Sequence, residues 1–209
     1  MSTSNTRPTS IVFDFGGVLI GWNPRNLYRK LFNGDEAAME DFLANVCTQE
    51  WNVKQDAGRP LAEATEILVA KFPAYEDLIR AYYDRWEEMI SGPIEGTVEI
   101  LTELKAANYP LFGLSNWSAE TFARLYPRPP YHFLHWFEVI VLSGKVKLVK
   151  PDPAIYDVLL KRSNRSPQEC LFIDDSYKNI AAARELGFHA IHFQSPHQLR
   201  SELREMGVL

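Results

Sequence analysis

Two short apolar runs near opposite ends of this 209-residue chain both end in aspartate. Residues 11–13 (Ile-Val-Phe) lead into Asp14, and residues 170–173 (Cys-Leu-Phe-Ile) lead into Asp174 and Asp175. Such runs are typical of strands buried on both faces of a parallel sheet, whose carboxyl ends form the ligand-binding edge of α/β proteins. Carboxylates that meet there repel one another unless a cation joins them, and oxygen ligands suit a hard divalent ion such as Mg²⁺. The pattern predicts a metal-carboxylate site on an α/β fold.

Strand and helix patterns alternate along most of the chain. The expected strands cover residues 11–15, 109–114, 137–142, 170–173 and 189–193, and the helices between and after them cover 96–107, 118–126, 153–163, 177–186 and 196–206. Alternation of this kind indicates a parallel sheet with right-handed crossovers and helices on both faces. We therefore expect an α/β protein with a Rossmann-like three-layer core.

The block between the first strand and the next carries helical patterns only. Helices are expected at 24–32, 35–47, 61–72 and 75–91. Because this block is too long for a crossover, we interpret it as an inserted helical cap. The expected division is a disordered tail at 1–9, a core made of 10–20 and 93–209, and a cap at 21–92.

The composition is that of an ordinary globular enzyme, with 46% hydrophobic and 23% charged residues. A net charge of −5 argues against a nucleic-acid partner. Cys47 and Cys170 are expected to be free thiols, residues 1–10 do not resemble a signal peptide, and no apolar stretch approaches membrane-spanning length. We expect a cytoplasmic protein without a membrane partner, either a monomer or a homodimer.

Further polar residues follow the other expected strands. In chain order, the strand-end residues are Asp14, then Ser115 and Asn116, then Lys150, and finally Asp174, Asp175 and Asn179. A carboxylate nucleophile, a hydroxyl, a lysine and a metal-binding acidic pair are the groups that phosphoryl transfer to an aspartate requires.

With these four motifs in this order, residues 11 to about 193 resemble a haloacid dehalogenase (HAD) superfamily hydrolase. The closest resemblance is to phosphatases of subfamily I, which carry a helical C1 cap after the first strand. It implies that Asp14 forms an aspartyl-phosphate, that Ser115 and Lys150 are catalytic, and that Ser115 and Asn116 contact phosphate. Gly17 belongs to the same phosphate-binding set. A small phosphorylated metabolite, such as a sugar phosphate, is the implied substrate.

The resemblance also implies the metal ligands. They are Asp14, the backbone carbonyl of Gly16, Asp175 and Asp174, with Asn179 in a supporting role, and the implied ion is Mg²⁺.

Gly16 departs from the pattern of typical phosphatases in the family, which carry a second aspartate there as the general acid and base. Glycine keeps the carbonyl but has no side chain to move protons, an assistance worth about 10²–10⁴-fold in rate. A leaving group of low pKa needs less protonation, so we expect anomeric, acyl or aryl phosphates to be favoured over alkyl esters.

Two alternatives stay open. A 2-haloacid dehalogenase also lacks the second aspartate, and its nucleophile, here Asp14, would attack carbon without a metal. The pair Asp174 and Asp175 disfavours this reading, because two negative charges would face a carboxylate substrate without a cation. The other alternative is a catalytically weak protein that binds a phosphometabolite without turning it over.

The cap should supply substrate contacts. The candidates are Trp22, Arg25, Trp51, Gln55 and Arg59. Residues 50–59 are expected to form a loop that faces the cleft, although a plain connection between helices with Trp51 as its packing anchor is equally compatible. Lys145 and Lys147 compete with Lys150 as the catalytic lysine, and Trp117 is either a cleft wall or part of the core.

Overall fold

The computed structural model describes residues 7–209, so residues 1–6 of the expected tail lie outside the described part. The rest of that expected tail is ordered against the core. Pro8 is buried, and the N–H of Thr9 donates to the carbonyl of Glu169. The prediction of disorder is therefore wrong for residues 7–9, because they lead into β1, which begins at Ser10, and Thr9 already bonds to the residue before β6.

Five parallel strands form the central sheet, in the order β5-β4-β1-β6-β7. Their bounds are Ser10–Phe13 (β1), Leu111–Ser115 (β4), Val139–Leu142 (β5), Cys170–Asp174 (β6) and His189–His192 (β7). The central strand β1 pairs with β4 on one side and with β6 on the other, and its four residues are all buried. The expected α/β fold with a parallel sheet is confirmed.

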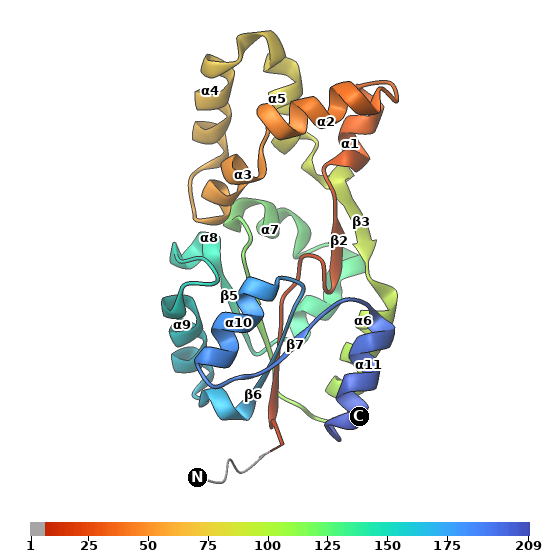
Figure 1. Cartoon of the computed structure of the whole chain (residues 1–209), viewed down its shortest axis with the longest axis vertical. Helices are drawn as coiled ribbons and strands as arrows, with labels where there is room; N and C mark the ends of the chain where they lie inside the picture. The colour runs from red at the N-terminus through yellow and green to blue at the C-terminus, as the bar shows by residue number, and fades with distance from the viewer. Residues whose placement is uncertain (1–6) are drawn as a thin grey trace.

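Helices cover both faces of this sheet (Figure 1). One face packs against α6 (Glu95–Ala106) and α11 (Pro196–Glu205), and the other against α9 (Pro153–Ser163) and α10 (Tyr177–Glu185). Side chains alternate along β1. Ile11 therefore packs in the hydrophobic cluster that includes α6 and α11, and Val12 packs in the cluster that includes α9 and α10. The core thus has three layers.

A helical block stands on the carboxyl edge of the sheet, next to α7 (Ala119–Leu125) and α8 (Ser143–Val146) (Figure 1). Its helices are α1 (Arg25–Leu31), α2 (Glu36–Asn45), α3 (Gln49–Asp56), α4 (Leu61–Lys71) and α5 (Glu76–Asp84), followed by a 3₁₀ helix at Trp86–Met89. An antiparallel pair of short strands, β2 (Ile20–Trp22) and β3 (Ile90–Pro93), links the block to the core.

Two sequence predictions about this block are wrong. The helix expected over 75–91 ends at Asp84, because residues 90–93 pair with β2 instead and Gly92 adopts a φ of 102° that no helix contains. The loop expected over 50–59 is mostly helix α3. Thr48 caps this helix by accepting the Trp51 N–H at its side-chain oxygen, and polar residues on its exposed side hide the helical pattern.

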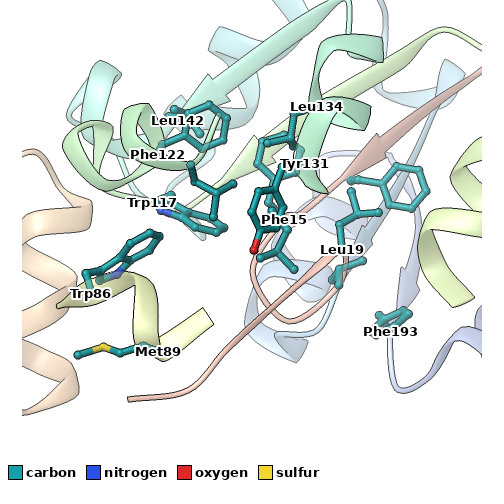
Figure 2. Close-up of a cluster of buried hydrophobic side chains, with 14 of the residues drawn as sticks. Phe15, Leu19, Trp86, Met89, Trp117, Phe122, Tyr131, Leu134, Leu142 and Phe193 are labelled. Carbon is teal, nitrogen blue, oxygen red and sulfur yellow. The ribbon is translucent and has the colours of Figure 1, made fainter. Parts of the chain in front are cut away.

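Aromatic side chains join the block to the core. Trp86 of the 3₁₀ helix lies beside Trp117, with ring centroids 5.9 Å apart, and Phe122 of α7 continues the same cluster (Figure 2). One hydrophobic cluster therefore extends from the block into the sheet layer. No helix within residues 7–209 is long and apolar enough to cross a membrane.

Candidate active site

Asp14 stands at the carboxyl end of β1, where three donors reach its carboxylate. The Ser115 hydroxyl at the end of β4 donates to Oδ1 across 2.6 Å, and the Phe15 N–H donates to the same oxygen across 2.7 Å. The Lys150 ammonium lies 3.0 Å from Oδ2. Of the three candidate lysines, Lys150 is the one that lies against Asp14.

Lys150 is also bound to Asp174. Its Nζ donates to Asp174 Oδ2 across 2.6 Å and to the Leu114 carbonyl across 2.8 Å, in a fully buried position. Burial opposes the charged ammonium, but Asp14 and Asp174 together raise the pKa of Lys150 above its ordinary value. The lysine is therefore a fixed positive charge beside Asp14.

The carboxylate of Asp174 accepts hydrogen bonds at both of its oxygens. The Asn179 amide donates to Oδ1 and Oδ2 across 3.0 Å each, and the Ser176 N–H donates to Oδ1 across 2.7 Å. With Lys150 added, Asp174 is surrounded by donors and wholly buried. It holds Lys150 and Asn179 in place.

Asp14, Asp174 and Asp175 can each offer one carboxylate oxygen within 4.8 Å of the others. Burial raises the pKa of Asp14 and of Asp175 above the usual range, and the negative charge of Asp174 raises both further. Oxygen ligands that crowd like charges in this way fit a hard divalent cation. The residues present thus suit the metal that the sequence implies.

The loop after Asp14 passes directly against Asp175. Gly17 has a φ of 73°, and a Cβ placed there would lie within 2.2 Å of Asp175 Oδ2. Only glycine fits, because the position needs both a left-handed backbone and no side chain.

The Asn116 side chain fixes the loop that carries Lys150. Its Nδ2 donates to the Lys150 carbonyl across 3.0 Å, and its Oδ1 accepts the Lys150 N–H across 2.8 Å. The Asn116 amide thus pairs with both backbone groups of Lys150, as a neighbouring strand would. This pairing sets the direction in which the lysine side chain enters the site.

A cavity of about 410 Å³ opens between the helical block and these strand ends. The core lines it with residues that include Gly16, Gly17, Asn116, Trp117, Lys150, Asp175 and Asn179, and the block with Trp22, Gln49, Asn52, Val53, Asp56, Tyr83 and Trp86. Trp117 is both a wall of the cavity and part of the core, at 6% exposure.

Four of the substrate contacts expected from the sequence do not line this cavity. Arg25 forms a two-point ion pair with Glu40, at 2.5 and 2.6 Å. Trp51 is buried against Tyr82 and is thus a packing anchor, whereas Gln55 and Arg59 hydrogen-bond to each other. Trp22 is the one member of that set that lines the cavity.

The structure adds a residue that the sequence reasoning missed, Asp56 at the end of α3. Its Oδ1 accepts the Ser118 N–H across 3.1 Å, which ties the block to the core. Burial raises the pKa of Asp56 to about 7, the Ser118 N–H lowers it, and the negative Asp14 raises it. A polar stretch read as a loop gave no sign of it, although the Thr48 cap was a usable signal for a helix.

Comparison with known proteins points to one family. A model for haloacid dehalogenase-like hydrolases matches residues 9–187. A sesquiterpene phosphatase of Aspergillus oryzae is 24% identical over 195 residues, which cover 93% of this chain and 94% of that protein. A phosphorylated carbohydrates phosphatase of Thermotoga maritima is 26% identical over 190 residues, covering 88% and 83%. Acyl-CoA dehydrogenase family member 10 of Mus musculus is 26% identical over 94% of this chain, but the chain spans only 19% of that protein.

Solved structures share the fold. A HAD family enzyme from Bacteroides thetaiotaomicron, in complex with magnesium and inorganic phosphate, has a TM-score of 0.68 at 22% identity, covering 90% of this chain and 95% of that one. An L-2-haloacid dehalogenase from Xanthobacter autotrophicus, with chloropropionic acid covalently bound, has a TM-score of 0.61 at 18% identity, covering 95% and 83%. The same fold is thus found in a protein that binds magnesium and phosphate and in a dehalogenase. The reaction of this chain therefore has to be argued from the residues of its site.

Proposed function

The chain belongs to the haloacid dehalogenase-like hydrolases, and on that premise we propose that it is a Mg²⁺-dependent phosphatase acting through an aspartyl-phosphate at Asp14. One observation carries the proposal. The Asp14 carboxylate faces a hydroxyl and an ammonium at 2.6 and 3.0 Å, with Asp174 at the end of β6 and the next residue, Asp175, beside it. A nucleophile, two groups that neutralise phosphate oxygens and a site for a divalent ion are then all within reach of one phosphate.

Each residue has a defined part in this reaction. Asp14 attacks phosphorus, while the Ser115 hydroxyl and the Lys150 ammonium neutralise charge on the equatorial phosphate oxygens. Asn116 and Gly17 line the same cavity, and we assign their backbone to contact phosphate. A bound Mg²⁺ supplies positive charge that lessens the repulsion between the Asp14 carboxylate and the phosphate.

For the metal we propose Asp14, Asp175 and the Gly16 carbonyl as direct ligands. Asp174 belongs to the same cluster, but its oxygens already accept from Lys150, Ser176 and Asn179. We therefore assign Asp174 to positioning the lysine, with Asn179 supporting it.

The proposed domains are a core at 10–20 and 93–209 and a helical C1 cap at 21–92. A cavity of about 410 Å³ between them suits a small phosphorylated metabolite, such as a sugar phosphate, and Trp22 offers an aromatic face for its organic part. Arg25 would reach a substrate only by leaving Glu40. The buried, free thiols of Cys47 and Cys170 support a reducing compartment, the cytoplasm.

A 2-haloacid dehalogenase is the rival function, because its fold is shared. In that reaction, as the family resemblance implies, Asp14 would attack carbon. The substrate of such an enzyme is a carboxylate, and Asp175 on the cavity wall would repel it without a cation. A protein that only binds phosphometabolites would leave the Lys150 and Ser115 contacts to Asp14 without catalytic use.

The test is phosphate release from p-nitrophenyl phosphate, sugar-1-phosphates and sugar-6-phosphates, with Mg²⁺ and with EDTA. We expect metal-dependent release that falls to background in Asp14→Asn, a variant of nearly the same shape whose folding is checked by thermal unfolding. Halide release from 2-haloacids without metal would overturn the proposal in favour of the dehalogenase. Binding of a sugar phosphate without any release would favour the binding role.

A further inference from the structure

Gly16 leaves the core side of the site without a group that can give a proton to the leaving oxygen. The acid is missing because the residue is glycine, and not because a side chain would lack space. Among the described residues, a Cβ at Gly16 would meet only Trp117, at 3.9 Å, and the backbone there is not left-handed. A phosphatase with this site needs an acid from elsewhere, unless its leaving groups are strongly acidic.

Asp56 is a carboxyl group on the opposite wall of the same cavity. It is the last residue of α3, and the cavity that it lines also contains Gly16, Lys150 and Asp175. The Ser118 N–H donates to its Oδ1 across 3.1 Å, and the Ser143 hydroxyl donates to its backbone carbonyl across 2.5 Å. Two core groups thus hold this residue of the helical block against the strand ends.

A chain of hydrogen bonds inside the block orients the other carboxylate oxygen. The Asn52 amide donates to Asp56 Oδ2 across 3.2 Å, and the Tyr83 hydroxyl donates to Asn52 Oδ1 across 3.0 Å. The Gln55 amide in turn donates to the Tyr83 hydroxyl across 3.0 Å, and Arg59 donates to Gln55 Oε1. This chain fixes the Asn52 amide with its N–H₂ toward Asp56, and it explains why Gln55 and Arg59 turn away from the cavity.

The surroundings of Asp56 favour a carboxyl group that exchanges a proton near neutral pH. Burial raises its pKa to about 7, against the effect of the Ser118 N–H, and the negative Asp14 adds to the rise. Tyr82 and Tyr83 of α5 are titratable neighbours, and the charged groups Lys150, Asp175 and Lys178 line the same cavity. No salt bridge reaches Asp56 from residues 7–209. An acid or base works best when its pKa lies near the operating pH.

We propose that Asp56 is the general acid and base of the phosphatase reaction, supplied by the helical block in place of a side chain at position 16. The proposal rests on the phosphatase function proposed above. It makes Asp56 a catalytic residue that touches the leaving oxygen, with Asn52 and Tyr83 as its positioning residues.

The proton balance has two steps. When an Asp14 oxygen bonds to phosphorus, the phosphorus–oxygen bond to the leaving group breaks with its electron pair, and the leaving oxygen takes the Asp56 proton and departs as an alcohol. In the second step the Asp56 carboxylate takes a proton from water as the water oxygen bonds to phosphorus. The bond from phosphorus to Asp14 then breaks toward the carboxylate, which releases hydrogen phosphate and returns Asp56 to its protonated form.

The experiment compares wild type, Asp56→Asn and Glu50→Gln by rapid mixing with p-nitrophenyl phosphate and with a sugar-6-phosphate, in Mg²⁺. Glu50 is exposed on the same helix, so its substitution makes the same change of charge away from the cavity. p-Nitrophenolate leaves without a proton, whereas the alkoxide of a sugar-6-phosphate needs one.

For Asp56→Asn we expect turnover of the sugar-6-phosphate to fall by about 10²–10⁴-fold. With p-nitrophenyl phosphate, the first release of p-nitrophenolate should keep its wild-type rate as a burst of one equivalent, followed by slow turnover because the second step lacks its base. An intact burst also shows that the variant is folded. Glu50→Gln should match wild type throughout.

A double variant tests the same idea from the other side. Gly16→Asp in the Asp56→Asn background should recover at least a tenth of the lost turnover, since position 16 has room for a side chain. If the burst with p-nitrophenyl phosphate slows as much as turnover of the alkyl ester, Asp56 only latches the block to the core and the proposal is wrong. Unchanged turnover in Asp56→Asn would overturn it as well. An inactive wild type would overturn the proposed phosphatase function itself. That result is distinguishable from a failure of the proposal for Asp56, in which wild type is active.

Discussion

The ammonium of Lys150 and the carboxylate of Asp174 form a wholly buried ion pair, with Nζ 2.6 Å from Oδ2. Neither charge can be solvated, so each depends on the partners around it. Apart from Asp174, the lysine has a second carboxylate partner, Asp14, at 3.0 Å. Apart from Lys150, Asp174 has only neutral donors, those of Asn179 and Ser176. The pair therefore sets the position of the lysine that faces Asp14.

Replacing Asp174 with asparagine should destabilise the protein strongly. Either orientation of the new amide turns its N–H₂ toward a donor, Lys150 or Ser176, and one buried charge pair is lost. We expect the free energy of unfolding to fall by about 3 kcal/mol. Denaturant unfolding of the metal-free protein measures it.

The neighbouring aspartate provides the matched control. Asp175 is exposed, and its negative charge is crowded by Asp174. Asp175→Asn should therefore leave the stability of the metal-free protein within about 1 kcal/mol of wild type. Equal destabilisation by both substitutions would contradict the positioning role that separates Asp174 from Asp175.

Mg²⁺ should stabilise the folded protein. An ion that joins Asp14 and Asp175 binds only when β1 and β6 lie side by side, and at 100 times its Kd it adds about 2.7 kcal/mol. For a chain of this length that corresponds to a rise in Tm of roughly 5–10 °C. Thermal unfolding in 10 mM Mg²⁺ and in EDTA measures the rise. It should vanish in Asp14→Asn and in Asp175→Asn, and a rise that persists in both variants would place the metal elsewhere.

The strand-end residues could be predicted from the sequence because their placement follows from a rule of topology. Once residues 11–13 and 170–173 are read as buried parallel strands, the carboxyl groups of Asp14 and Asp174 must meet at one edge. Lys150 could also be predicted, because the resemblance assigns it in preference to Lys145 and Lys147, and the structure shows how the local backbone separates these lysines. Lys147 takes a left-handed conformation at the end of α8, whereas Lys150 is held by the Asn116 amide.

The cap side of the site could not be predicted in the same way, because no rule of topology fixes which side chains of an inserted helix face a cavity. In α3, Trp51 and Gln55 turn inward to pack, while Asn52 and Asp56, one position further along, face the cleft. The ion pair of Arg25 could not be predicted for a related reason. Its partner Glu40 lies fifteen residues away on the next helix, and the sequence does not show that the two meet.

Gly17, in the loop that follows Asp14, offers a further test of the proposed metal site. Gly17→Ala places a Cβ against Asp175 Oδ2 in a left-handed backbone with φ of 73°. Gly34→Ala is the matched control, because its φ is 84° and nothing lies within 4 Å. Both substitutions should cost about 1–2 kcal/mol of stability through backbone strain.

Only Gly17→Ala should also displace a metal ligand. We expect it to weaken Mg²⁺ binding by at least about tenfold, as titration calorimetry would measure. Relief of the overlap moves the Asp175 oxygen by about an ångström, and a small, rigidly coordinated ion does not tolerate such a shift of a ligand. Wild-type affinity in Gly17→Ala would show that Asp175 is free to adjust or does not hold the ion.

The effect of pH on stability should reveal Asp56. Burial raises the pKa of Asp56 in the folded protein to about 7, above its unfolded value of 3.8. The folded state therefore binds this proton more tightly, so the contribution to stability is complete below pH 3.8 and is lost as pH rises through 7. The Asp56→Asn variant has no proton to bind at this position, so its stability lacks this dependence on pH. The free energy of unfolding of wild type, relative to that of Asp56→Asn, should fall by about 2–4 kcal/mol between pH 5 and pH 8.

Denaturant unfolding at the two pH values, in EDTA, measures this difference. Asp14 titrates in both proteins, so its own contribution to the pH dependence of stability largely cancels in the comparison. Its negative charge raises the pKa of Asp56, and the value of about 7 already includes this effect. Glu50→Gln, exposed on the same helix, should follow wild type at both pH values. A difference between wild type and Asp56→Asn that stays constant with pH would mean that this carboxyl group is ionised across the range, and it would then have no proton to give to a leaving group.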